Sequence, residues 1–90
     1  MTRSYSVVIP AYNAQDTIAE ALNSVLGQTL PVTAIYVVDD GSTDRTAERA
    51  AAVADIITVI RKENGGPGSA TSAGLRAATT DYVATLDSDD

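Results

Sequence analysis

Four short apolar segments recur along this chain, and segments with a helical pattern separate them. The apolar segments are rich in β-branched residues and cover residues 5–9, 35–38, 56–60 and 82–86. Continuous apolar strands that alternate with helices are typical of a parallel sheet covered by helices on both of its faces. The pattern therefore predicts an α/β fold of the Rossmann-like, three-layer kind.

Three helices are expected, over residues 17–28, 43–54 and 68–78. The first places its apolar side chains on one face, and the other two have narrow faces of alanine and glycine that suit close packing on a sheet. These faces are formed by Ile18, Ala21, Leu22, Val25 and Leu26, then Ala47, Ala50, Ala51 and Ala54, and finally Ala70, Ala73, Gly74 and Ala77. The segment 65–68, Gly-Gly-Pro-Gly, lacks the dinucleotide-binding spacing and is predicted to be mainly a flexible loop.

Acidic residues gather in two places. Of the twelve in this chain of 90 residues, half lie in two clusters that directly follow apolar segments: Asp39, Asp40 and Asp44, and then Asp87, Asp89 and Asp90. The net charge of −6 argues against nucleic acid or an anionic membrane surface as a partner. Because the chain has no histidine and no cysteine, carboxylates are the main candidates for acid–base or metal chemistry.

The first apolar segment ends at Pro10 and is too short for a signal peptide or a membrane span. No membrane segment is therefore expected in this chain. We expect it to be cytoplasmic, and a membrane anchor in any remainder of the protein, at the inner face of the membrane, stays open.

Polar residues follow three of the four predicted strands. They are the segments 10–13, 39–42 and 87–90. In an open parallel sheet, ligands bind beyond the carboxyl ends of the strands. The sequence therefore predicts one ligand site, at one edge of the sheet.

Asp87 and Asp89 are two residues apart, just past the end of the fourth predicted strand. A turn there can direct both carboxylates at one cation, and such hard oxygen ligands suit Mg²⁺ or Mn²⁺. The alternative is that these aspartates cap a following helix or solvate a turn.

The cluster that follows the second strand has two interpretations. For Asp39 and Asp40 a functional role is the favoured interpretation, because adjacent carboxylates at a strand end repel each other unless a ligand or a hydrogen-bond donor is present. For the next three residues, Ser42, Thr43 and Asp44, capping of the following helix is the favoured interpretation.

After the first strand, Tyr12 either lies against a base or sugar ring or packs partly into the core with its hydroxyl exposed. Asn13 is expected to start a turn or to cap a helix rather than to touch a ligand.

Four segments in succession resemble the signatures of family 2 glycosyltransferases with the GT-A fold. They read VVIPAYNAQDTIAEALNSVLGQT, VVDDGSTDRT, NGGPGSATSAGL and DYVATLDSDD, and the resemblance covers nearly the whole chain, from Ser6 to Asp90. The order and the intervals also agree with the family, which makes the set far more specific than any single motif. The expected sheet order is then 3-2-1-4.

The resemblance implies transfer of a sugar from a nucleoside diphosphate donor, often UDP-linked, to a carbohydrate or lipid-linked acceptor, with inversion and with Mn²⁺ or Mg²⁺. By position, Pro10, Ala11 and Tyr12 would line the nucleoside pocket and Asp39 would bind the base. The resemblance also implies that Asp87 lies by the ribose or the metal and that Asp89 is the metal ligand.

The chain departs from the family pattern at one place, because Thr71-Ser72 stands where the family usually has Arg-Asn. Arg76, one turn further on, is expected to be a surface residue. We expect residues 1–90 to be the N-terminal nucleotide-sugar-binding part of a GT-A domain, truncated after the Asp-x-Asp motif. The acceptor-binding half and the catalytic base would then be absent, and the exposed edge of the sheet predicts self-association.

Three other classes of protein share some of these features. A response-regulator receiver also places paired aspartates and Mg²⁺ at strand ends, but it would carry the acidic pair after its first strand. A haloacid-dehalogenase-type phosphatase could use Asp87 and Asp89 as nucleophile and acid, although that motif normally follows the central opening strand. A nucleotide-binding fragment without catalytic competence is the third.

Overall fold

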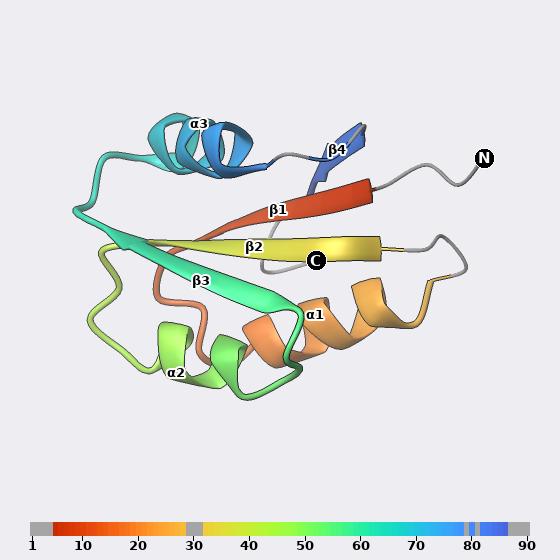
Figure 1. The fold of residues 1–90 in the computed structure, drawn as a ribbon. Helices are drawn as coiled ribbons and strands as arrows, with labels where there is room; N and C mark the ends of the chain where they lie inside the picture. Colours follow the sequence, from red (N-terminus) through yellow and green to blue (C-terminus); the bar gives the residue numbers. More distant parts are fainter. Residues whose placement is uncertain (1–4, 29–31, 79, 81, 87–90) are drawn as a thin grey trace.

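The protein forms a single parallel sheet with helices on both faces (Figure 1). The computed structural model describes residues 5–28, 32–78, 80 and 82–86. The strands are β1 (Tyr5–Ala11), β2 (Val32–Asp40), β3 (Ile57–Lys62) and β4 (Tyr82–Thr85), and the helices are α1 (Ile18–Leu26), α2 (Thr46–Ala51) and α3 (Pro67–Ala77). The sheet order is β3-β2-β1-β4 with all neighbours parallel, so the predicted α/β class and strand order are confirmed.

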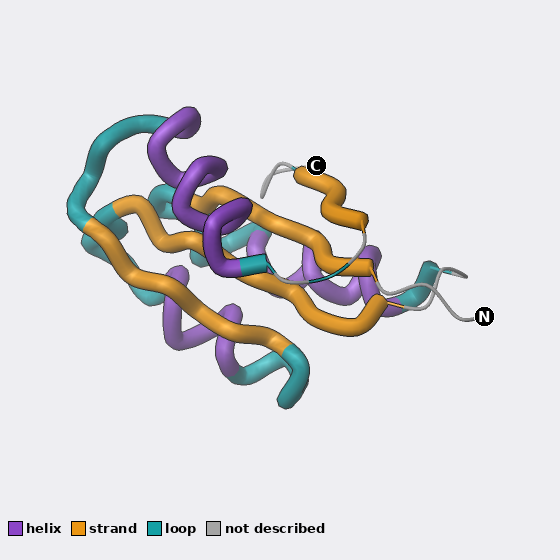
Figure 2. Tube along the Cα trace, turned by 45° about the horizontal axis from the view of Figure 1, so that its top comes forward, coloured by secondary structure: helices purple, strands orange, loops and turns teal. Residues whose placement is uncertain are grey.

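The two layers of helices follow from the alternation of side chains along the strands. Figures 1 and 2 show α1 and α2 against one face of the sheet and α3 against the other. On β1, Val7 and Ile9 are buried in the core with α1, whereas Val8 is buried with Ala70 of α3. Successive strand residues point to opposite faces, so the continuous apolar run supplies both cores.

The strand order also excludes one of the alternatives, the response-regulator receiver. A receiver domain has the order 2-1-3-4-5, in which its third strand lies beside the first. Here β3 pairs with β2, and β4 lies on the other side of β1. The receiver alternative is therefore wrong.

Two strands are longer than the sequence predicts. β1 continues through Pro10 to Ala11, and β2 covers 32–40, so that Asp39 and Asp40 lie inside it. Pairing with neighbouring strands extends both elements, since Ala11 is opposite Asp39 and Asp40 is opposite Lys62. Tertiary pairing therefore overrides the poor strand preference of aspartate and proline.

The second helix is shorter than predicted, because α2 has only 6 residues. Its expected alanine face is correspondingly reduced: Ala50 is buried, whereas Ala51 is exposed. The small-residue face of α3 is confirmed, because Ala70 is buried and Ala73 packs beside it. Gly74 lies so close to the sheet that an added Cβ would be 2.3 Å from Val8 Cγ1.

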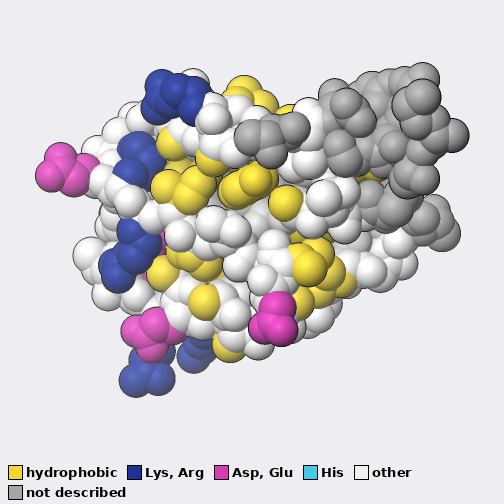
Figure 3. All heavy atoms as spheres, in the orientation of Figure 1, with side chains coloured by type: hydrophobic (Ala, Val, Ile, Leu, Met, Phe, Trp, Pro, Cys, Tyr) yellow, Lys and Arg dark blue, Asp and Glu magenta, His cyan; other side chains and the backbone are white. Residues whose placement is uncertain are grey.

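Some apolar side chains remain exposed, one just before β3 and others elsewhere, including α3. Ile56 and Leu75 are 41% and 47% exposed, and Figure 3 shows apolar side chains over β3 and beneath α3. Self-association through the exposed edge of the sheet stays a prediction. In the ranges that the structure describes, no helix combines the length and the apolar character needed to cross a bilayer.

Candidate functional site

The carboxyl ends of β1 and β2 lie side by side and form the edge at which the sequence predicts a ligand. Ala11 pairs with Asp39 across the two strands, so Pro10, Ala11 and Tyr12 are brought to the same edge as Asp39. Ala11 is buried, Pro10 is half-buried and Tyr12 is 53% exposed. The exposure of Tyr12 leaves its ring available to a base or a sugar.

The loop after β1 is held by the loop after β2. Asn13 adopts a left-handed conformation with φ 49°. Its backbone N–H donates to Ser42 Oγ at 2.8 Å, and its side-chain Oδ1 accepts from the Thr43 backbone N–H at 2.9 Å. Asn13 lies in a bend, and the turn that follows starts one residue later, at Ala14, whose carbonyl accepts from the Thr17 N–H. Capping by Ser42 and Thr43 is wrong, because both residues bond to Asn13 and α2 begins only at Thr46.

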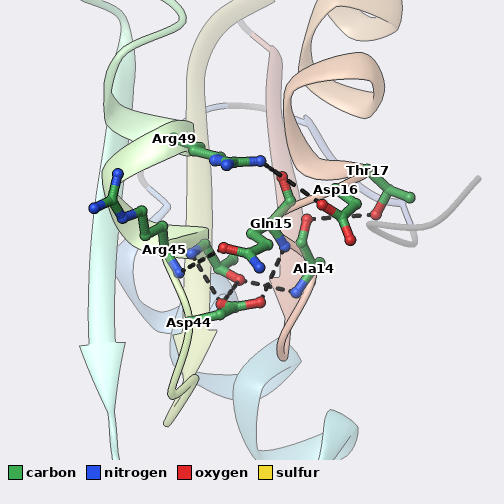
Figure 4. A network of polar contacts seen from close by, with 8 residues as sticks. Ala14, Gln15, Asp16, Thr17, Asp44, Arg45 and Arg49 are labelled. Atoms are coloured by element: carbon green, nitrogen blue, oxygen red, sulfur yellow. Dashed lines mark hydrogen bonds and ion pairs between the residues drawn. The ribbon is translucent and has the colours of Figure 1, made fainter.

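A second set of hydrogen bonds connects the same loops through Asp44 and Thr46 (Figure 4). The backbone N–H of Thr46 donates to Asp44 Oδ1 at 3.0 Å, and the Thr46 hydroxyl also donates to Asp44 Oδ1. Across the loops, the Ala14 N–H donates to Thr46 Oγ1 at 2.8 Å and the Gln15 N–H to Asp44 Oδ2 at 3.3 Å. Asp44 is not the cap residue itself, because Arg45 precedes α2, but its carboxylate accepts the N–H of Thr46, the first residue of the helix.

Two arginines of the α2 region complete this framework. Arg45 N–H donates to Gln15 Oε1 at 3.3 Å, and Arg49 donates from its guanidinium to the Gln15 carbonyl at 2.9 Å. Arg49 also lies 3.8 Å from Asp16, whose side chain is 88% exposed, so this ion pair contributes little. The loops on both sides of the candidate site are therefore fixed by hydrogen bonds from the chain itself.

Asp40 is a structural residue, which corrects the interpretation of the Asp39–Asp40 pair as jointly functional. Its carboxylate accepts from Lys62 Nζ at 2.7 Å and from the backbone N–H groups of Gly65 and Gly66, both at 2.9 Å. The hydrogen-bond donors that stabilise its negative charge are therefore supplied by the chain itself. Sequence reasoning missed Lys62 as its partner, although the pairing of adjacent β2 acids with adjacent β3 bases was a usable signal.

The same contacts revise the interpretation of segment 65–68. It was expected to be a flexible loop, but Gly65 and Gly66 are bound to Asp40 and α3 begins at Pro67. Gly66 has φ 92°, in the region that favours glycine. The N–H groups at the start of α3 thus donate hydrogen bonds to the carboxylate of Asp40 and are not free to bind a phosphate.

Acid should destabilise the protein through Asp40. The hydrogen bond from Lys62 outweighs burial and, with those from Gly65 and Gly66, holds the pKa of Asp40 below its ordinary value of 3.8. A lowered folded pKa gives stability that is present above the unfolded value and is lost as pH falls through the folded value.

We therefore expect the free energy of unfolding of Asp40→Asn to fall less steeply than that of the wild type from about pH 5 downwards. Urea unfolding at several pH values measures this. Asp55→Asn is the control, since Asp55 is exposed and has no ion pair or hydrogen bond with the described residues. Part of the pH dependence remains in Asp40→Asn: burial raises the pKa of Asp44, but hydrogen bonds from Thr46 and Gln15 outweigh it and lower that pKa. Equal slopes for wild type and Asp40→Asn would contradict the assignment.

Asp39 differs from its neighbour because half of its carboxylate has no hydrogen bond. It is 1% exposed, and its Oδ1 accepts from the Ser42 N–H at 3.0 Å. Its Oδ2 is buried and has no hydrogen-bond partner among the described residues. The nearest charge is Arg61, with Nε 3.5 Å away. A buried acceptor without a donor costs free energy, so it marks a place where a ligand N–H would be favourable.

The other predicted site residues are less directly located. Asp87 and Asp89 lie outside the described residues, and no group of three potential metal ligands occurs among those described. The Leu86 N–H donates to the Val8 carbonyl at 3.0 Å, so the chain leaves β4 beside β1. Thr71 is half-buried and Ser72 is exposed on α3, and Arg76 is exposed as expected.

Comparison with known proteins gives a consistent result. Residues 6–90 match the sequence model of "Glycosyl transferase family 2". The succinoglycan biosynthesis protein ExoO of Rhizobium meliloti (strain 1021) is 42% identical over 85 residues, which are 92% of this chain and 24% of that protein.

Two solved structures extend the comparison to the fold. The mannosyltransferase PcManGT of Pyrobaculum calidifontis, in complex with GDP-Man and Mn²⁺, superposes with a TM-score of 0.89 at 28% identity, over 99% of this chain and 28% of its own. Glucosyl-3-phosphoglycerate synthase of Mycobacterium tuberculosis, in complex with Mn²⁺, UDP and glucosyl-3-phosphoglycerate, gives a TM-score of 0.81 at 33% identity, over 96% and 33%. The chain thus spans about a quarter to a third of the length of these proteins.

Proposed function

Because the chain belongs to glycosyl transferase family 2, we propose that it forms the donor-binding part of an enzyme that transfers a sugar from a nucleoside diphosphate to an acceptor. Residues 1–90 would be the N-terminal nucleotide-sugar-binding part of a GT-A domain. The similar proteins are three to four times longer, which is consistent with an acceptor site and a catalytic base outside these residues.

The observation that carries this proposal is the buried Oδ2 atom of Asp39, which has no hydrogen-bond partner among the described residues. A carboxylate only accepts hydrogen bonds, so the matching ligand group is a donor such as the N–H of a nucleobase. Asp39 lies at the carboxyl end of β2, next to the end of β1, where open α/β sheets bind ligands.

Pro10, Ala11 and Tyr12 are proposed to line the nucleoside pocket beside Asp39. The exposed ring of Tyr12 offers a flat apolar surface on which a base can lie. We propose uracil as the base and therefore a UDP-linked donor. The mycobacterial structure in complex with UDP supports this choice, whereas the mannosyltransferase structure in complex with GDP-Man makes GDP the competing ligand in any test.

We further propose that Asp87 and Asp89 hold Mn²⁺ or Mg²⁺, with Asp89 as the ligand that faces the diphosphate. Both similar structures contain Mn²⁺. These aspartates directly follow Leu86, which is hydrogen-bonded to β1. When bound, a divalent ion neutralises charge on a departing diphosphate. Inversion, and a carbohydrate or lipid-linked acceptor held by further parts of the protein, complete the proposed reaction.

A calorimetric titration with UDP, in the presence and absence of Mn²⁺, tests the donor site. Asp39→Asn should lower UDP affinity by about tenfold or more, since the loss of a hydrogen bond to a charged group is commonly of that size. The Asn oxygen is needed for the Ser42 N–H, so its amide NH₂ would face the base N–H. Asp89→Asn should remove the effect of Mn²⁺ on UDP affinity.

The exposed Asp55 again provides the matched control, and Asp55→Asn should bind UDP as the wild type does. Circular dichroism establishes that each variant is folded. Folded wild-type protein that binds neither UDP nor GDP with Mn²⁺ present would overturn the proposal. Tighter binding of GDP than of UDP would keep the donor site and reject uracil.

A further inference from the structure

The parallel register of β2 and β3 sets two adjacent acids opposite two adjacent bases. Asp39 is the partner of Arg61, and Asp40 is the partner of Lys62. Because successive strand residues point to opposite faces, the two pairs lie on opposite faces of the sheet. Asp39 shares the face of Ile35 and Val37, which pack with α1, whereas Asp40 lies on the α3 side.

The two pairs use their charges differently. Lys62 donates a hydrogen bond to Asp40 at 2.7 Å, and its side chain is only 21% exposed. The guanidinium of Arg61 approaches Asp39 Oδ2 no closer than 3.5 Å, the Arg61 side chain is 69% exposed, and this side chain makes no hydrogen bond with any residue that the structure describes. The Asp40–Lys62 pair is therefore hydrogen-bonded. In the Asp39–Arg61 pair, a buried carboxylate oxygen and the guanidinium N–H groups have no hydrogen-bond partner among the described residues.

We propose that Arg61 reads the nucleobase together with Asp39. This inference rests on the proposed donor site. Asp39 Oδ2 accepts the N–H of the base, and the Arg61 guanidinium donates to the carbonyl oxygen next to that N–H. The guanidinium of Arg61 is exposed and has no hydrogen bond to give up among the described residues, so turning to the base changes only its 3.5 Å ion pair with Asp39.

The chemistry of the pair favours uracil over cytosine. A carboxylate only accepts and a guanidinium only donates, so the base must offer a donor to Asp39 and an acceptor to Arg61. Uracil presents N3–H beside the O4 carbonyl. Cytosine in the same position presents an acceptor at N3 and an amino group at C4, so both contacts would become repulsive.

The test compares UDP and CDP affinities by calorimetry with Mn²⁺ present. In Arg61→Gln, UDP affinity should fall by about tenfold, the usual size for one hydrogen bond to a charged group. The preference for UDP over CDP should fall by a similar factor, because a glutamine amide can accept as well as donate. Arg61→Lys keeps a cation that only donates and should retain most of the preference.

Arg76→Gln is the matched control, since Arg76 is also an exposed arginine but lies on α3. It should leave both affinities unchanged. If Asp39→Asn loses UDP binding while Arg61→Gln keeps the wild-type affinity and preference, this inference is wrong and the donor site stands. If folded wild-type protein binds no nucleoside diphosphate, the inference fails together with the proposed function.

Discussion

Replacing Gly74 with alanine should lower the free energy of unfolding by about 3 kcal/mol, at the upper end of the usual cost of overpacking. The added Cβ would lie 2.3 Å from Val8 Cγ1 and 3.2 Å from Val38 Cγ2. Both valines are fully buried on the central strands β1 and β2, so they cannot move aside without displacing the sheet or α3. The effect is opposite in sign to the ordinary preference of helices for alanine over glycine.

Gly68, in the same helix, provides a control of the same chemistry. A Cβ there would meet no atom within 4 Å, so Gly68→Ala should be neutral or stabilising by up to about 1 kcal/mol. Urea unfolding of the two variants against the wild type measures the contrast. A Gly74→Ala protein as stable as Gly68→Ala would show that α3 does not pack this closely on the sheet.

Replacing Asp40 with alanine should cost a similar amount, about 3 kcal/mol, the lower end of the cost of removing one partner of a buried ion pair. The change leaves the backbone N–H groups of Gly65 and Gly66 without their acceptor, and it leaves Lys62 Nζ with the Glu63 carbonyl but no counter-charge. Lys62 can regain water because its side chain is 21% exposed, which is why we expect the lower end.

Lys62→Met separates the components of this site by urea unfolding. It should destabilise the protein less than Asp40→Ala, because the two glycine N–H groups keep their acceptor. Asp55→Ala, at an exposed position, should change the stability by less than about 0.5 kcal/mol. If Asp40→Ala is no more destabilising than Asp55→Ala, the carboxylate does not anchor the start of α3.

Much of the architecture could be predicted from the sequence, because it depends on local patterns. The apolar runs of β1 and β2 are largely buried, and so are Ile18, Ala21, Leu22 and Val25 of the predicted α1 face, as their periodicity indicates. Leu26, the last residue of that face, is 38% exposed at the point where α1 ends. The order β3-β2-β1-β4 came from the family resemblance, since periodicity alone does not say which strands are neighbours.

The site was harder to predict, because it depends on how distant segments are aligned. From the sequence, Asp39 and Asp40 are equivalent strand-end acids. What separates them is the register to β3 and the approach of the 65–66 segment, 25 and 26 residues away from Asp40. The short α2 has the same origin, because Ser42 and Thr43 bond to Asn13, about 30 residues away in the sequence, rather than cap a helix.

The bonded loops after β1 and β2 have a consequence for the speed and the entropy of ligand capture. Asn13, Ala14 and Gln15 all donate to the loop at the start of α2, through Ser42, Thr46 and Asp44. Because these two loops are already ordered, they lose little conformational freedom when a ligand binds. Nucleotide association should therefore be a single fast step without a slow rearrangement, and amide hydrogens of these residues should be protected from exchange before any ligand is added.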